Sequence, residues 1–194
     1  MAGNALPAKG ETRDLTRDDW LRAAVAALAE GGVEAVKVER LAKTLGVSKG
    51  SFYWHFKDRP QLLAAILDFW DADFTQQLID NAADRTTPKE RLRHLAQDAL
   101  VKTVYGIDSA RAEAAIQSWA ATDAHVAERL RAVDSARLAY LEKELAAAGQ
   151  QPDKARARAK MLYLALLGLY AARGYNQDLA DDSAYLALVE LALE

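Results

Sequence analysis

The stretch that decides the fold is VERLAKTLGVSKGSFYWHFKDRPQLL, residues 38–63 of a chain of 194 residues. Its first eight residues repeat apolar side chains every three or four positions, which predicts a short helix with one buried face. Gly46 then supplies the left-handed backbone that a sharp turn after a helix requires. Ser48 caps a further short helix that we expect to run to about His55. Two short helices joined by a glycine turn are typical of a helix-turn-helix, whose second helix enters the major groove of DNA.

The segment before this motif completes a small helical head. A helix is expected to begin at Thr16, with Asp19 in the capping-box position, and to end at Gly31. Its apolar residues fall on one face of the helix. Phe52 and Phe56 lie four residues apart and are expected to hold the motif against that face.

The rest of the chain also has helical periodicity, and strand signals are nearly absent. A fourth helix, capped by Asp58, is expected to continue to Phe74 and to connect the head to a body. Further helices are expected over residues 89–105, 109–121, 124–148, 152–174 and 182–193. The sequence therefore predicts an all-α chain of about nine helices, with a DNA-binding head over 14–74 and a larger body over 75–194.

Composition limits the class of protein. Hydrophobic residues make up 51% of the chain, which is enough to form a core, and the absence of cysteine excludes disulfide and thiolate chemistry. Residues 1–13 are polar and do not resemble a signal peptide. The most continuous apolar stretch, residues 161–172, is shorter than the roughly 20 residues that span a bilayer. We therefore expect a cytoplasmic protein with no membrane partner.

The charge of the chain is unevenly distributed. The net charge is −3, but residues 37–60 contain six basic and two acidic residues, while residues 61–194 contain 15 basic and 20 acidic residues. A basic end on an acidic body suits a protein that docks this end on phosphates. The amino-terminal arm, with Lys9 and Arg13, is a candidate for a minor-groove contact, the alternative being an arm without this function.

The second helix of the motif presents several side chains to solvent. Three large polar aromatic residues in a row cannot all be buried on one short helix, so at least one is exposed for contact. A glycine inside this helix costs about 1 kcal/mol relative to alanine, which is understandable where the backbone must approach DNA closely. The exposed positions are expected to be Lys49, Gly50, Ser51, Tyr53, Trp54 and His55.

The segment GVSKGSFYWHFK, residues 46–57, closely resembles the DNA-binding head of the tetracycline-repressor (TetR) family, and the resemblance extends over about residues 14–74. Many relatives open the helix before the turn with a threonine or serine that binds phosphate; here Val38 occupies that place, and Lys37 or Arg40 are candidates to replace the contact. By resemblance, the bases are contacted at Lys49, Gly50 and Ser51, phosphates or thymine methyls at Tyr53, Trp54 and His55, and a further phosphate at Lys57 or Arg59. The resemblance implies a homodimeric repressor of a palindromic double-stranded DNA operator, released by a small-molecule effector of unknown identity.

The body supplies candidates for effector binding and for dimerisation. The large aromatic residues that are candidates to line an effector cavity, or else to fill a core, are Trp70, Phe74, Tyr105, Trp119 and Tyr163. Residues 161–172 are apolar nearly all round and must be covered on two sides, and the last helix is similar. Pairing with a second copy would cover them, although burial within one subunit is the alternative. The interface candidates are Leu162, Leu166, Leu169, Tyr170, Leu186, Val189 and Leu193.

No pattern in the sequence predicts catalysis, a metal or a cofactor. Nucleophile motifs, glycine-rich phosphate loops and paired carboxylates at a telling spacing are absent. His94 with Asp98, and His125 with Glu128, have the spacing of shared metal ligands, but no third ligand accompanies either pair. Two other functions remain open, namely a DNA-binding repressor without a ligand, and a helical-bundle enzyme or small-molecule binding protein.

Overall fold

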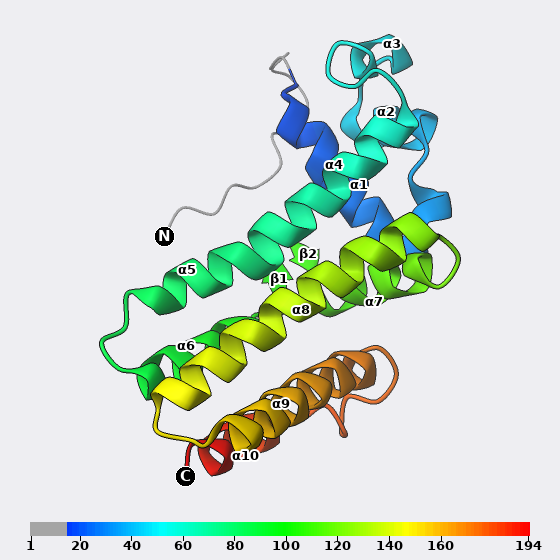
Figure 1. The fold of residues 1–194 in the computed structure, drawn as a ribbon. Coiled ribbons are helices and arrows are strands. Elements are labelled where there is room, and N and C mark those ends of the chain that lie inside the picture. The colour runs from blue at the N-terminus through cyan, green and yellow to red at the C-terminus, as the bar shows by residue number, and fades with distance from the viewer. Residues whose placement is uncertain (1–14) are drawn as a thin grey trace.

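The computed structural model describes residues 15–194, so the predicted arm contact of Lys9 and Arg13 lies outside the described residues. The described chain is almost entirely helical, as the sequence predicts (Figure 1). The helices are α1 (Arg17–Gly31), α2 (Val38–Leu45), α3 (Lys49–Phe52), α4 (Arg59–Asp71), α5 (Gln77–Ala83), α6 (Pro88–Ala99), α7 (Ser109–Ala120), α8 (Ala124–Ala147), α9 (Pro152–Arg173) and α10 (Asp182–Leu193). A short 3-10 turn, Val33–Ala35, precedes α2.

The head forms as its local signals indicate. The Thr16 hydroxyl accepts from the Asp19 backbone, and the Asp19 carboxylate accepts from the Thr16 backbone at 2.8 Å, so the predicted capping box is present. The Phe52 ring meets the fully buried Trp20 ring of α1 edge-on, with centroids 5.3 Å apart, and stacks with Phe56 at 5.6 Å. These aromatic contacts hold the helix-turn-helix on α1.

The recognition helix α3 is shorter than predicted. Gly46 has the expected left-handed backbone, with φ 71° and ψ 27°, but α3 ends at Phe52 instead of near His55. The chain continues in i→i+3 turns, with the His55 amide donating to the Phe52 carbonyl at 2.9 Å. Ser48 stands at the start of α3, yet its side chain makes no capping hydrogen bond. An uncapped start and a glycine in the first turn both weaken a short helix, which explains the tighter continuation.

The connection between head and body is one long helix. α4 passes into a π-helical stretch, Ala72–Gln76, and then into α5 without a break. The ten labelled α-helices of residues 15–194 therefore form nine helical rods, the number that the sequence predicts. The predicted domain boundary between residues 74 and 75 falls inside the π-helical stretch, and it stays a prediction. Short π-helical stretches within α-helices are frequent at functional sites.

A β-hairpin replaces the end of one predicted helix. The helix expected over residues 89–105 ends at Ala99, and strands β1 (Thr103–Val104) and β2 (Ile107–Asp108) follow as an antiparallel pair. Between the strands, Tyr105 and Gly106 both have positive φ, 52° and 79°. This is the backbone of the two-residue hairpin turn that matches strand twist, which explains why the helix stops before it.

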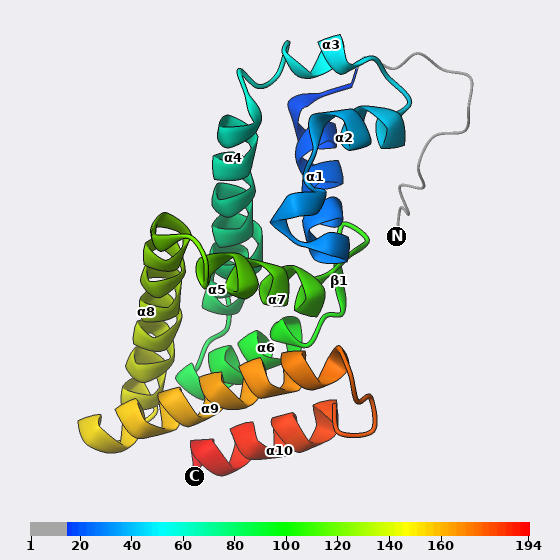
Figure 2. The ribbon, with the colours of Figure 1, turned by 90° about the vertical axis from the view of Figure 1, so that its right-hand side faces the viewer.

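The head and the outermost helices of the body lie at opposite ends of the molecule (Figure 2). α3 is at the upper edge of this view and α9 with α10 at the lower edge, while α7 lies beneath α1. One hydrophobic core runs from Trp20 through α4 to Trp119 and Val133, and a second core joins α6, α9 and α10. None of the described helices combines the length and the apolarity needed to cross a membrane.

Candidate DNA-binding surface and effector cavity

Helix α3 and the turns that follow it carry most of the predicted DNA-contacting residues, and α3 lies at the outer end of the head (Figure 1). Trp54 and Tyr53 are large aromatic side chains that are 88% and 56% exposed, and with Ser48, Gly50 and Ser51 they form a shallow hollow. Lys49 and Lys57 are exposed, whereas His55 is half-buried. The structure therefore presents aromatic, hydroxyl and cationic groups together at one end of the chain.

Two of the predicted DNA-contacting cations are engaged in ion pairs within the head. The Lys49 ammonium donates to the Glu39 carboxylate, and this hydrogen bond lowers the pKa of Glu39 and raises the pKa of Lys49. Arg40 is paired with Glu30 at 3.0 Å. Both pairs are exposed, so each cation can exchange its carboxylate for a DNA phosphate at little cost.

Arg59 has a structural position in the head. Its guanidinium donates to the carbonyl oxygens of Val36 and Val33, both at 2.7 Å, and its side chain is half-buried. These bonds tie the start of α4 to the segment before α2. The sequence places Arg59 at a phosphate as the alternative to Lys57, and the structure leaves the Lys57 side chain as the exposed one of the two.

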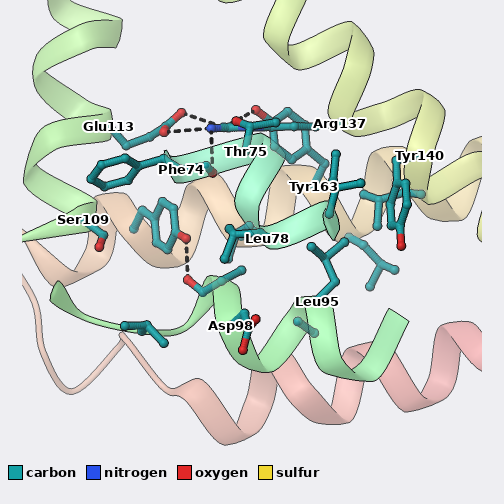
Figure 3. Close-up of a pocket in the computed structure, with 18 of the residues that line it drawn as sticks. Phe74, Thr75, Leu78, Leu95, Asp98, Ser109, Glu113, Arg137, Tyr140 and Tyr163 are labelled. Carbon is teal, nitrogen blue, oxygen red and sulfur yellow. Dashed lines mark hydrogen bonds and ion pairs between the residues drawn. The ribbon is translucent and has the colours of Figure 1, made fainter. Parts of the chain in front are cut away.

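A cavity of about 90 Å³ lies in the body, below the head (Figure 3). The π-helical stretch, α6, α7, α8, α9 and α10 all contribute to its largely apolar wall. Among the five predicted effector-binding residues, Phe74 and Tyr163 line the cavity. Trp70 and Trp119 are buried in the adjacent core instead, and Tyr105 is 57% exposed on the hairpin. The structure thus brings together only part of the predicted set.

A buried ion pair forms one wall of the cavity (Figure 3). Glu113 of α7 accepts from Arg137 of α8 at 3.0 Å and from the Trp70 indole at 2.9 Å. Arg137 also donates to the Thr75 hydroxyl at 2.9 Å and to the Tyr163 hydroxyl at 3.1 Å. Burial raises the pKa of Tyr163 above its usual range, so this phenol stays protonated. The sequence analysis did not predict the pair between Glu113 and Arg137. Its only signal in the sequence is that each residue is a charged one on the inner, apolar face of its helix.

Two hydroxyl groups of the lining have no partner. Ser109 Oγ and Tyr140 Oη are buried, and neither makes a hydrogen bond with the described residues. Burial also raises the pKa of Tyr140, which keeps its hydroxyl protonated. Buried polar atoms in proteins are usually satisfied by protein or water. These two atoms are therefore available to a molecule inside the cavity.

The β-hairpin connects the cavity to the head. The Tyr105 hydroxyl donates to Asp73 of the π-helical stretch at 3.0 Å, and the Arg22 guanidinium of α1 lies 4.5 Å from the Tyr105 ring centroid. The Phe69 ring is 5.9 Å from the same ring. Val104 of the hairpin lines the cavity. A change in the cavity wall therefore has a short route to α1.

Most of the predicted interface residues are covered within the chain. Leu162, Leu169, Val189 and Leu193 are buried in the core that joins α9 and α10, whereas Leu166, Tyr170 and Leu186 are half-buried. Leu166 and Tyr170 also line the cavity, and the Tyr170 hydroxyl donates to the Ala99 carbonyl. Other apolar side chains of the same two helices are exposed, and they are Met161, Leu164 and Leu191.

The histidine pairs do not form metal sites in the structure. His94 Nε2 lies 3.6 Å from Asp98 Oδ2, and the Arg85 guanidinium also contacts the His94 ring. Over residues 15–194, no cluster of three or more histidine, aspartate or glutamate residues is arranged to hold a metal ion.

The amino-terminal part of the chain is similar to known regulators. Residues 21–66 match the family model described as "Bacterial regulatory proteins, tetR family". The HTH-type transcriptional repressor KstR2 of Mycolicibacterium smegmatis is 38% identical over 82 residues, which cover 41% of this chain and 38% of that protein. The tetracycline repressor protein class C of Escherichia coli is 39% identical over 54 residues, covering 28% of this chain and 25% of that protein. This chain therefore matches less than half of the length of these relatives.

The whole fold is similar to solved regulators. SmeT, the repressor of the Stenotrophomonas maltophilia multidrug efflux pump SmeDEF, has a TM-score of 0.68 and 25% identity, covering 93% of this chain and 91% of SmeT. A transcriptional regulator from Saccharomonospora viridis, solved in complex with choline, has a TM-score of 0.76 and 14% identity, covering 90% and 93% of the two chains. The likeness of fold thus extends well beyond the matched head.

Proposed function

We propose that this chain is a cytoplasmic transcriptional repressor of the TetR family, which binds a palindromic operator as a homodimer and leaves it when a small molecule enters the body. The match of residues 21–66 to the family model supports this proposal. The named relatives are regulators, which supports a regulator over an enzyme. The observation that carries the proposal is the exposed end of the head, where Tyr53 and Trp54 accompany Lys49 around the hollow of α3.

In the proposed complex, α3 enters the major groove. Lys49, Gly50 and Ser51 face the bases, while Tyr53, Trp54, His55 and Lys57 contact the backbone or thymine methyls. Lys37 and Arg40, beside the start of α2, supply further phosphate contacts. The two-fold symmetry of a dimer places two such helices about 34–36 Å apart, or a multiple of that distance, on one face of the DNA.

The proposed dimer interface uses the exposed apolar side chains of α9 and α10. Met161, Leu164 and Leu191 are 57–66% exposed at the end of the molecule farthest from α3. Exposed apolar side chains on two helices that pack together are candidates for contact with a partner. An interface at this end leaves both heads free to contact DNA. We propose these exposed residues in place of the buried interface candidates predicted from the sequence.

Release by an effector requires that the ligand prefers a conformation that does not fit the operator. Typical couplings are about 1–3 kcal/mol. The continuous α4–α5 helix and the hairpin both join the cavity to the head, so either element can transmit the change. A small molecule can bind to a protein of this fold, because the regulator from Saccharomonospora viridis was solved in complex with choline.

The experiment that tests this function is a selection of genomic DNA fragments by the purified chain at near-physiological salt, followed by affinity measurement on the enriched site. We expect a short palindrome bound by one dimer. The double variant Lys49→Ala, Tyr53→Ala is expected to lose most operator affinity while remaining folded. Lys154→Ala, an exposed lysine at the start of α9, is the control. Equal affinity of the double variant and the wild type would refute the placement of α3 in the groove.

A further inference from the structure

We infer that the cavity selects an uncharged ligand with an apolar body and a hydrogen-bonding group at one or both ends, and that it rejects carboxylates. This inference rests on the proposed function of the cavity as the effector site. It follows from the charges, the unpaired hydroxyls and the size of the site, taken in turn.

The charged groups of the lining leave no cation for an anionic ligand. Arg137 is the one basic residue of the lining, and its guanidinium is already committed to Glu113, Thr75 and Tyr163. The other charged lining residues are carboxylates, so a ligand carboxylate would enter an environment that already carries excess negative charge. Burying an unpaired charge is strongly unfavourable, and like charges add to that cost.

The carboxylates of the lining have partners within the chain, which weakens the attraction of the site for a cation. Glu113 accepts from Arg137 and from the Trp70 indole. Asp73 accepts from the Tyr105 hydroxyl at 3.0 Å, and Asp98, at the margin of the site, lies 3.6 Å from His94 and 3.4 Å from Asn81. A buried ligand cation would have to share one of these carboxylates with a group of the protein.

The unpaired hydroxyls indicate where the polar groups of a ligand lie. Ser109, at the start of α7, and Tyr140, on α8, appear on opposite sides of the cavity (Figure 3). A hydroxyl both donates and accepts, so each can bond an uncharged carbonyl, amide or alcohol. Between them the wall is apolar, with Leu78 and Leu95 among its side chains. A ligand that bonds both hydroxyls removes two unsatisfied atoms from the protein interior.

The volume of the cavity limits the size of the compounds that can be used to test it. Its volume of about 90 Å³ is of the same order as the cavity of about 150 Å³ that binds benzene in another protein. Compounds with a single ring are therefore suitable for testing the charge preference, and a larger effector must widen the cavity.

The test uses four compounds of nearly equal size with the full chain at pH 7, measured by titration calorimetry. Benzamide is uncharged and polar, benzoate is anionic, benzylamine is cationic, and toluene lacks polar groups. We expect benzamide to bind about tenfold or more tightly than benzoate and benzylamine, because the anion finds no free cation and the cation must share a carboxylate with a group of the protein. Equal or tighter binding of benzoate overturns the inference, and so does binding of none of the four compounds.

The variants Ser109→Ala and Tyr140→Phe separate recognition from folding. Each removes a hydroxyl that bonds nothing in the free protein, so the thermal unfolding midpoint should stay constant or rise. Benzamide affinity should fall about three- to tenfold in at least one variant, while toluene affinity stays unchanged. An unchanged benzamide affinity in the double variant refutes the assigned hydroxyls.

The matched control is Tyr170→Phe, which removes a hydroxyl of the same lining that bonds the Ala99 carbonyl. It should lower the unfolding midpoint and leave the order of the four compounds unchanged. The affinity for the operator, measured without any compound, tests the proposed DNA-binding function separately. Ser109→Ala and Tyr140→Phe are expected to bind the operator as the wild type does, so failure of the ligand inference is distinguishable from failure of the regulator proposal.

Discussion

At the scale of single residues, the ion pair between Lys49 and Glu39 holds a proposed base-contacting cation on the surface of the head. This pair also helps to place the Lys49 side chain before DNA arrives. In the complex, the Glu39 carboxylate would stand close to phosphates and repel them. The pair therefore favours the free protein over the complex.

We predict that Glu39→Gln raises operator affinity a few-fold and reduces its dependence on salt only slightly. The reason is that Lys49 no longer has to leave a carboxylate to reach DNA. Glu34→Gln removes the same charge from an exposed position of the head, where no ion pair with another described residue is found, and serves as the control. The measurement is fluorescence anisotropy of labelled operator at several salt concentrations. If both variants gain equally, net charge alone explains the effect.

Local residue signals could be predicted from the sequence because they depend on neighbours in the chain. The Thr16–Asp19 capping box and the left-handed Gly46 follow from short-range geometry, and the structure has both. The pairing of Glu113 with Arg137 could not be predicted, because the two residues lie on different helices and meet only after these helices pack. A lone charge in an amphipathic pattern does not identify its partner.

At the scale of elements, the β-hairpin is the feature that the helical periodicity concealed. Each strand contributes only two residues to the pairing. The hairpin turn is defined by the positive φ angles of Tyr105 and Gly106, and these angles are not visible in a helical pattern of apolar residues. A non-glycine residue with a left-handed backbone costs energy, so surrounding contacts must hold it in place. Here Arg22, Asp73 and Phe69 provide those contacts.

We predict that Tyr105→Phe loosens the π-helical stretch without unfolding the hairpin. The variant keeps the ring over Arg22 but removes the hydroxyl that Asp73 accepts. Faster amide hydrogen exchange is expected in peptides covering Ala72–Gln76, and little change is expected in α2. Tyr175→Phe, at an exposed tyrosine after α9, is the control and should leave exchange in this stretch unaltered. Unchanged exchange in Tyr105→Phe would show that the hydroxyl does not couple the two elements.

At the scale of the whole molecule, the head and the upper body share one core. This core includes Trp20 of α1 and extends to Val133 of α8. The helix-turn-helix therefore packs against the body and is not a separate domain on a flexible linker. The all-α architecture and the order of elements follow from periodicity in the sequence. The cavity does not, because the same apolar residue types line cavities and fill cores. The dimer candidates illustrate this, since Leu162 and Val189 proved to be core residues.

We predict that Leu164→Asp converts the dimer to a monomer and weakens operator binding by at least tenfold. Leu164 is 66% exposed on α9, so the substitution leaves the monomer core intact while placing a charge in the proposed interface. Leu179→Asp, at an exposed leucine between α9 and α10, is the control. Sedimentation velocity gives the oligomeric state and circular dichroism verifies folding. A folded Leu164→Asp dimer would place the interface elsewhere.

The exposure of Trp54 gives the molecule an intrinsic optical probe. The chain has four tryptophans, and Trp20, Trp70 and Trp119 are at most 8% exposed, whereas Trp54 is 88% exposed. Water-relaxed, red-shifted emission and collisional quenching by acrylamide therefore arise almost wholly from the recognition surface. An indole pressed against a sugar-phosphate backbone loses that access to quencher. Operator titrations can thus be read from the unlabelled protein, because the responsive emission comes from a residue that we propose to contact the DNA.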